Sequence, residues 1–192
     1  MTILIIILIQ PPKILQRRII IILKFRPGPL HIIVSSASTQ EEQKNKQVVR
    51  QFFEALNRQD TERMDQLVSS TNYSLHFSGM PPMDWNTNKK QFLAPFNKAF
   101  PDLTRNIVDL VAEGDKVAVS INLTGTYKGE FQGIPPTGKQ ISFTAMDILT
   151  IIDGKVTEEW ATADMMGLMQ QIGAIPTRSA SSDSSNNNNN AA

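Results

Sequence analysis

The chain has 192 residues, of which 41% are hydrophobic and 19% are charged, and its formal net charge is +1. These values are typical of a soluble protein with one folded domain, and the near-neutral charge does not indicate a nucleic-acid partner. The absence of cysteine excludes disulfides, thiolate catalysis and cysteine-based zinc sites. With only two histidines we expect no metal site, although carboxylates alone can hold Mg²⁺ or Ca²⁺.

Composition divides the chain into three parts. Residues 1–40 form an apolar N-terminal extension, residues 41–177 have the mixed composition of a folded domain, and residues 178–192 are a Ser- and Asn-rich tail. The tail cannot bury enough apolar surface to offset the entropy of the chain, so we expect it to be disordered.

Pro11 and Pro12, followed by Arg17 and Arg18, interrupt the apolar runs of the N-terminal part. Each run is therefore shorter than the roughly 20 residues that a transmembrane helix needs. We favour an extension outside the fold and a cytoplasmic protein. A membrane-associating segment and an unusual secretory signal are the alternatives, and the second would make the protein secreted.

Helical periodicity and one strand-like alternation fill the first half of the domain. The predicted helices cover residues 41–60, 61–68 and 86–100, and the strand covers residues 72–77. Pro95 lies inside the third helix, where it predicts a kink or a late start.

Period-two alternation dominates from residue 103 onward, and Gly-Asp and Asp-Gly pairs mark two hairpin turns. The predicted elements are strands over residues 103–113, 116–127, 139–152 and 155–164, and then a helix over residues 165–175. The complete order, α-α-β-α-β-β-β-β-α, predicts an α+β fold with helices packed on one face of a curved antiparallel sheet.

The stretch "GIPPTGKQ", residues 133–140, has the G-x-x-x-x-G-K spacing of a phosphate-binding loop. Pro135 and Pro136 remove two backbone donors, and Gln140 replaces the hydroxyl residue that would hold Mg²⁺. A strand pattern, and not a helix, follows it. We therefore interpret the stretch as a stiff connection between strands, and we expect no nucleotide cofactor.

The segments "AFPDL", "EGDKVAV", "TGTYKGEFQGIPPTGK", "IIDGKVTEEW" and "LMQQIGAIP" occur in this order along the chain. In these segments and their order, residues 45–176 resemble the SnoaL-like polyketide cyclase (ester cyclase) family of the nuclear transport factor 2-like (NTF2-like) superfamily. The resemblance implies a cone in which a curved sheet, with helices on its concave face, encloses an apolar cavity. It also implies a homodimer or homotetramer, and neither a metal nor an organic cofactor.

Alternation along the last predicted strand places Trp160 and Asp164 on the same face. The resemblance assigns the acid/base role of the family, an aspartate just past a tryptophan, to Asp164. Such a carboxylate takes a proton next to a carbonyl and returns one to the new alkoxide, provided that apolar burial raises its pKa. The alternative role is a helix cap, because Asp164 directly precedes the final helix.

His76 is the second catalytic candidate, since it can orient a substrate oxygen; the alternative is a partly exposed strand histidine. Asp147 interrupts an apolar alternation, so it requires either a role in the cavity or a structural partner. At two positions where the family often carries histidine, this chain has Tyr127 and Glu159. The substrate-binding candidates are Trp160, Asp147, Tyr127, Trp85 and Tyr73, and ordinary packing is the alternative for Trp85.

The resulting hypothesis is a cofactor-independent cyclase or isomerase that acts on a small apolar, polyketide-like carbonyl compound. One alternative is a binding protein that uses the same cavity without chemistry, because one fold hosts both functions. Another is a hydrolase similar to limonene epoxide hydrolase, in which carboxylates activate water and for which Arg105 and Asp109 are candidates.

Overall fold

The computed structural model describes residues 3–9, 19–25, 31–35 and 40–176. The predicted disordered tail lies outside the described residues, as does much of the N-terminal extension. Three strands of that extension, β1 (Ile3–Ile9), β2 (Ile19–Phe25) and β3 (His31–Ser35), pair with one another as an antiparallel sheet. That the extension lies outside the main fold stays a prediction. In the described ranges, no helix combines the length and apolarity that crossing a membrane requires.

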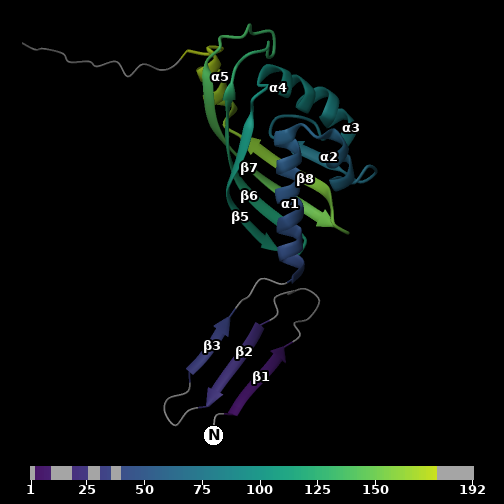
Figure 1. The fold of residues 1–192 in the computed structure, drawn as a ribbon, viewed down its shortest axis with the longest axis vertical. Helices are drawn as coiled ribbons and strands as arrows, with labels where there is room; N and C mark the ends of the chain where they lie inside the picture. The colour runs from purple at the N-terminus through teal and green to yellow at the C-terminus, as the bar shows by residue number, and fades with distance from the viewer. Residues whose placement is uncertain (1–2, 10–18, 26–30, 36–39, 177–192) are drawn as a thin grey trace, which may run out of the picture.

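The elements of the main domain follow the predicted order, and the predicted α+β class is confirmed (Figure 1). They are α1 (Gln40–Arg58), α2 (Thr61–Leu67), β4 (Ser74–Phe77), α3 (Trp85–Thr87), the π-helix η1 (Asn88–Leu93), α4 (Ala94–Ala99), β5 (Thr104–Glu113), β6 (Lys116–Thr126), β7 (Gln140–Ile152), β8 (Lys155–Ala163) and α5 (Met165–Ile172).

The main sheet has the strand order β4-β8-β7-β6-β5. Strands β5 to β8 form the predicted antiparallel meander, whereas β4 joins the edge of β8 in parallel, with His76 beside Trp160. Helix α1 runs across one face of this curved sheet (Figure 1). The stretch at residues 133–140 connects β6 to β7, so its interpretation as an inter-strand connection is confirmed.

A β-bulge in β8 changes which residues of that strand face the helices. Ile151 of β7 pairs with Val156, but the next residue along β7, Thr150, pairs with Glu158, so Thr157 is an extra residue. A bulge of this kind shifts the alternation by one position. Val156 and Glu159 are therefore both buried, although they stand three residues apart.

The third predicted helix is divided into α3, η1 and α4, and Pro95 lies in the first turn of α4. Pro95 has no N–H to donate to the carbonyl of Gln91, so a regular α-helix cannot run through it. Of the two predicted effects of Pro95, the structure shows the late start: α4 begins at Ala94, directly after the wider turns of η1. Single π-helical turns inside helices are frequent at functional sites.

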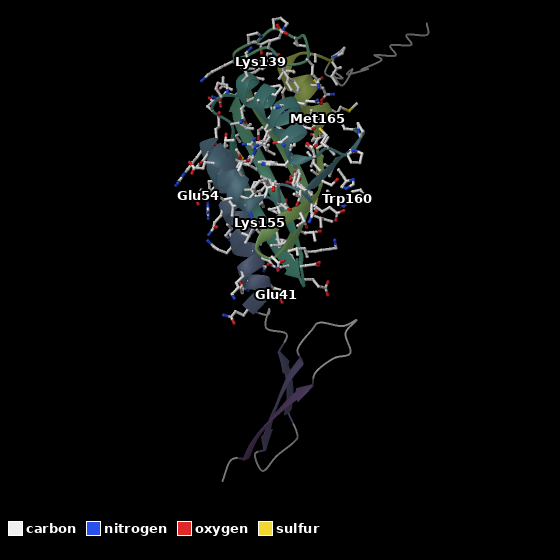
Figure 2. All side chains as sticks on the ribbon, turned by 90° about the vertical axis from the view of Figure 1, so that its right-hand side faces the viewer. Glu41, Glu54, Lys139, Lys155, Trp160 and Met165 are labelled. Carbon is white, nitrogen blue, oxygen red and sulfur yellow. The ribbon has the colours of Figure 1, made fainter. Side chains whose placement is uncertain are left out.

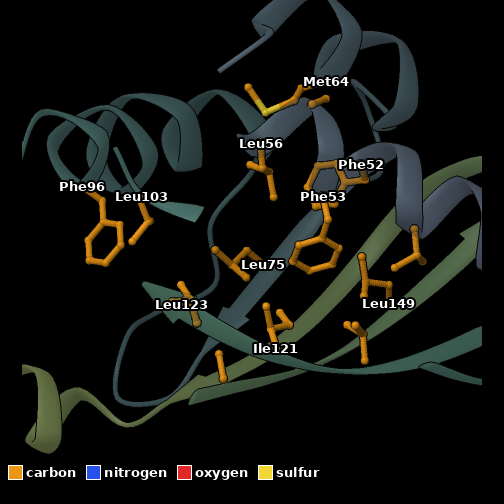
Figure 3. Close-up of a cluster of buried hydrophobic side chains, with 14 of the residues drawn as sticks. Phe52, Phe53, Leu56, Met64, Leu75, Phe96, Leu103, Ile121, Leu123 and Leu149 are labelled. Atoms are coloured by element: carbon orange, nitrogen blue, oxygen red, sulfur yellow. The ribbon is translucent and has the colours of Figure 1, made fainter. Parts of the chain in front are cut away.

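The hydrophobic core fills the space between α1 and the sheet (Figure 3). Phe52 and Phe53 extend from α1 toward Ile121, Leu123 and Leu149 of the strands, and all five side chains are buried. This packing holds α1 at a fixed distance from the sheet, and the candidate site lies beside it.

Candidate active site

A cavity of about 90 Å³ lies between the helices and the inner face of the sheet. One water molecule occupies about 30 Å³ in the liquid, so this volume suits a few waters or a small organic molecule. Four polar side chains line it: Asn88, Arg105, Asp147 and Glu159. The rest of the lining is apolar: Phe52, Phe53, Leu56, Leu75, Phe77, Phe92, Leu93, Phe96, Ile121, Leu123, Phe143, Ala145, Ala161, Ala163 and Met165.

Three charged groups enter the cavity from three different strands. Asp147 follows the inward alternation of β7, as the sequence pattern predicted for one of its two interpretations. Arg105 comes from β5, and the bulge in β8 brings in Glu159. The exposed fractions of Arg105, Asp147 and Glu159 are only 8%, 7% and 9%, so all three ionisable groups are almost fully shielded from water.

Burial shifts the pKa values of Arg105, Asp147 and Glu159. It raises the pKa of Asp147 well above its usual range, and the negative charge of Glu159 raises it further against the opposing effect of Arg105. Burial also raises the pKa of Glu159, but a hydrogen bond from Tyr73 and the charge of Arg105 oppose the rise. Burial lowers the pKa of Arg105 to about 10, which still leaves a cation at neutral pH. One proton held between the two carboxyl groups leaves the buried group, together with the Arg105 cation, neutral overall, and the hydrogen bond from Tyr73 favours the charged form of Glu159.

Two hydrogen bonds in series, from Asn88 to Tyr73 and from Tyr73 to Glu159, hold the Glu159 carboxylate in place. The Tyr73 hydroxyl donates to Glu159 Oε2 over 2.6 Å, and Asn88 Nδ2 donates to the Tyr73 oxygen over 3.0 Å. Burial and the neighbouring charge of Glu159 raise the pKa of Tyr73 well above its usual value, so the phenol keeps its proton. Tyr73, predicted to bind substrate, is thus placed to orient a cavity carboxylate.

Trp160, predicted to bind substrate, lies outside the cavity lining, on the opposite face of β8 from Glu159. Trp160 is 52% exposed and stacks on His76 on the outer face, with ring centroids 4.0 Å apart. Figure 2 shows Trp160 at the surface of the domain. His76 lies there beside Ser74, at 3.2 Å, and Glu158, at 3.6 Å, which places it away from the cavity. The bulge at Thr157 is the cause, since it turns Glu159 inward and Trp160 outward.

Asp164 is exposed and forms the N-cap of α5, where its Oδ1 accepts a hydrogen bond from the Gly167 N–H over 2.8 Å. A methyl group on Gly167 would collide with this carboxylate, so the residue pair is fitted to the cap. The helix-cap role, which was the alternative for Asp164, is therefore present in the structure. A catalytic role for Asp164 stays a prediction that its position outside the cavity lining does not support.

Two further substrate-binding candidates belong to the packing of the domain. Trp85 is buried, donates its indole N–H to Asp65 and packs against Tyr73. Tyr127 is fully buried; its hydroxyl donates to the Ile134 carbonyl and accepts from the Phe131 N–H, which fixes the connection between β6 and β7. Neither residue is part of the cavity lining, so substrate binding by Trp85 and Tyr127 stays a prediction that their positions do not support.

Asn88 and Glu159 are not among the residues that the sequence predicts for the site. For Glu159 a signal existed, because two adjacent glutamates in a strand must face opposite sides and one of them then faces the core. For Asn88 the sequence offered no signal. Asp109, the suggested partner of Arg105, is exposed and accepts a hydrogen bond from the adjacent Leu110 N–H, so Asp147 and Glu159 take its place beside Arg105. Within the described residues, no group of three or more acidic or histidine side chains is placed to hold a metal ion.

A family model described as SnoaL-like polyketide cyclase matches residues 46–172. The chain belongs to this family. Its fold is that of the nuclear transport factor 2-like superfamily, as the sequence resemblance predicted. No curated protein matches the chain. The predictions of a homodimer or homotetramer and of a cytoplasmic location stay predictions.

Solved structures support the same assignment. The proposed hydroxylase AclR from Streptomyces galilaeus has 28% identity and a TM-score of 0.66 over 72% of this chain and 87% of its own. A proposed SnoaL-like polyketide cyclase from Jannaschia sp. CCS1 has 25% identity and a TM-score of 0.67, over 74% of this chain and 100% of its own. A proposed polyketide cyclase from Bacillus cereus ATCC 10987 has 31% identity and a TM-score of 0.60, over 73% of this chain and 87% of its own.

Proposed function

We propose that this SnoaL-like protein is a cofactor-independent cyclase or isomerase that acts on a small apolar carbonyl compound, with Glu159 as base and Asp147 as acid. The observation that carries the proposal is the pair of buried carboxyl groups in an apolar cavity. Two carboxyl groups whose environments favour opposite protonation states are the usual basis of acid and base roles near neutral pH.

In the proposed reaction, the Glu159 carboxylate takes a proton from the carbon next to the substrate carbonyl. Asp147 donates its proton to the oxygen on which negative charge develops, either the carbonyl that enolises or the one that the new carbon–carbon bond attacks. Arg105 stabilises the anionic carboxylate before and after this exchange. The proton then returns from Glu159 to Asp147, directly or through water, and no atom is left unbalanced.

The size of the cavity limits the substrate. Sites for drug-sized ligands measure roughly 300–1,000 Å³, several times the volume found here. The structure therefore supports a compound of one small ring or a short chain. A larger polyketide requires side chains such as Phe92 and Leu93 of η1 to move.

The proposal is tested by hydrogen–deuterium exchange next to the carbonyl of cyclopentanone, followed by proton NMR in D₂O. The wild-type protein is expected to accelerate the exchange, and Glu159→Gln and Asp147→Asn are expected to reduce the acceleration by at least about 100-fold, the usual size of one acid/base contribution. Glu158→Gln is the matched control, because this adjacent glutamate lies outside the cavity lining, and it keeps the wild-type rate. Exchange at the uncatalysed rate with wild-type protein refutes the proposal and favours the binding-protein alternative.

A second candidate, the hydrolase, is favoured by one observation: the charge of Arg105 acts on both buried carboxyl groups. An arginine between two carboxylates can hold one of them as the base for a water and keep the other protonated to open an epoxide. Hydrolysis of cyclopentene oxide, with the same two variants, distinguishes this chemistry from carbonyl chemistry.

A further inference from the structure

Asn88 has an unusual position in the cavity wall. It is the first residue of η1, it is only 3% exposed, and it lines the cavity. Its backbone N–H donates to the Asp84 carbonyl over 2.9 Å, and its side-chain Nδ2 donates to Tyr73. Its Oδ1 is buried and accepts no hydrogen bond from any residue that the structure describes.

The hydrogen-bond chain fixes which end of the Asn88 amide faces Tyr73. The Tyr73 hydroxyl has one proton, and the 2.6 Å bond to Glu159 uses it. Its oxygen is then left as an acceptor, so the group that faces it must be the amide nitrogen of Asn88. The amide oxygen is therefore left for another partner. An unpaired buried acceptor destabilises the fold, and no other described group offers Asn88 Oδ1 a hydrogen bond that would offset this.

We propose that Asn88 Oδ1 is a recognition group for a hydroxyl or N–H donor of the ligand. The cavity then selects small apolar alcohols, enols or phenols over carbonyl compounds of the same shape. This inference rests on the proposed function in taking the cavity as the ligand site, but it does not depend on catalysis.

The proposal agrees with the chemistry assigned to Asp147. The oxygen that Asp147 protonates becomes a hydroxyl, which is the donor that Asn88 can accept from. A carbonyl oxygen offers no proton, so the substrate gains this hydrogen bond only as its oxygen is protonated. Asn88 thus stabilises the enol or alcohol form relative to the ketone form.

The test compares the binding of cyclopentanol and cyclopentanone, which differ in little but the donor, by ligand-observed NMR with the full chain. Wild-type protein is expected to bind the alcohol about tenfold more tightly, the value of one hydrogen bond to a buried group. Asn88→Ala removes the acceptor and reduces the ratio to about one. Asn86→Ala is the matched control, because Asn86 is an exposed asparagine two residues away, and it keeps the wild-type ratio.

Tyr73→Phe is the second variant, and it decides the question if Asn88→Ala does not fold. Without the hydroxyl the Asn88 amide can turn either end toward the ligand, so the ratio falls while ketone binding tightens. A merely structural role of Tyr73 would weaken both ligands equally. Equal binding of alcohol and ketone by the wild-type protein, or no binding of either, overturns the proposal. Preference for the alcohol without any exchange activity refutes the proposed function alone.

Discussion

Replacing Asp147 by Asn tests whether the cavity holds a proton in the folded state. The side chain is 7% exposed, and burial together with the charge of Glu159 raises its pKa above the ordinary value of 3.8. Asparagine has nearly the same shape and is neutral at every pH. The variant therefore resembles wild-type protein with a protonated Asp147.

The sign of the effect follows from proton linkage. Between the ordinary pKa and the raised pKa, the folded protein binds one proton more than the unfolded chain, so the stability of the wild type falls as the pH rises. For one proton the slope is about 1.4 kcal/mol per pH unit. Asp147→Asn lacks this contribution, so its stability relative to the wild type increases by that slope from about pH 4 upward. The difference becomes constant once the pH passes the folded pKa.

The assay is urea unfolding of both proteins at unit intervals from pH 4 to pH 8, followed by circular dichroism. Titrating groups remote from the cavity contribute equally to the two proteins and cancel in the difference, whereas Glu159 interacts with Asp147 and contributes to it. Asp109→Asn, which makes the same substitution at an exposed position of the same sheet, is the control for the change of side chain itself. A difference between Asp147→Asn and wild type that is independent of pH, or that decreases as the pH rises, contradicts a buried protonated carboxyl group.

Two further substitutions test the walls of the cavity and the connection beside it. Leu93 lines both the cavity and a surface groove of about 380 Å³, so Leu93→Ala should open a passage between them. Ligand-observed NMR should then show tighter binding of cyclooctanone. The lost side chain should also lower the free energy of unfolding by about 2 kcal/mol. Tyr127→Phe removes the hydroxyl that bonds the Ile134 carbonyl and the Phe131 N–H, which then keep only the hydrogen bond between them, so urea unfolding should show a loss of about 1 kcal/mol with unchanged cyclopentanol binding.

Periodicity was sufficient to predict the order of the elements, because each helix and strand has its own apolar spacing and the turns have their own residues. The approximate bounds of α1, β6 and β7 follow from it. The parallel pairing of β4 with β8 does not, since it joins segments about 85 residues apart and depends on how the sheet curves. Helix η1 was also not predictable, because Pro95 in the sequence indicates only that an α-helix is interrupted and not that π-helical turns precede it.

The candidate site was predicted only where simple alternation holds. Strand β7 is regular up to Leu149, and Asp147, for which a cavity role was one of two interpretations, lines the cavity. The same rule failed for β8, because strict alternation from Val156 places Trp160 on the buried face. A bulge costs one residue and leaves no distinct signature in the sequence, so only the pairing with β7 reveals it.

This bulge determines which carboxylate the cavity contains. Glu158 and Glu159 are adjacent and chemically almost equivalent, and a regular β8 would turn Glu158 inward with Val156 and leave Glu159 outside. With Thr157 as the extra residue, Glu159 meets Tyr73, and Glu158 lies on the outer face near His76 and Lys116. The buried carboxylate acquires a phenol donor and a nearby arginine, whereas the other remains partly solvated. The chemistry proposed for this protein therefore depends on one residue of strand register as directly as on the identity of the acidic side chain.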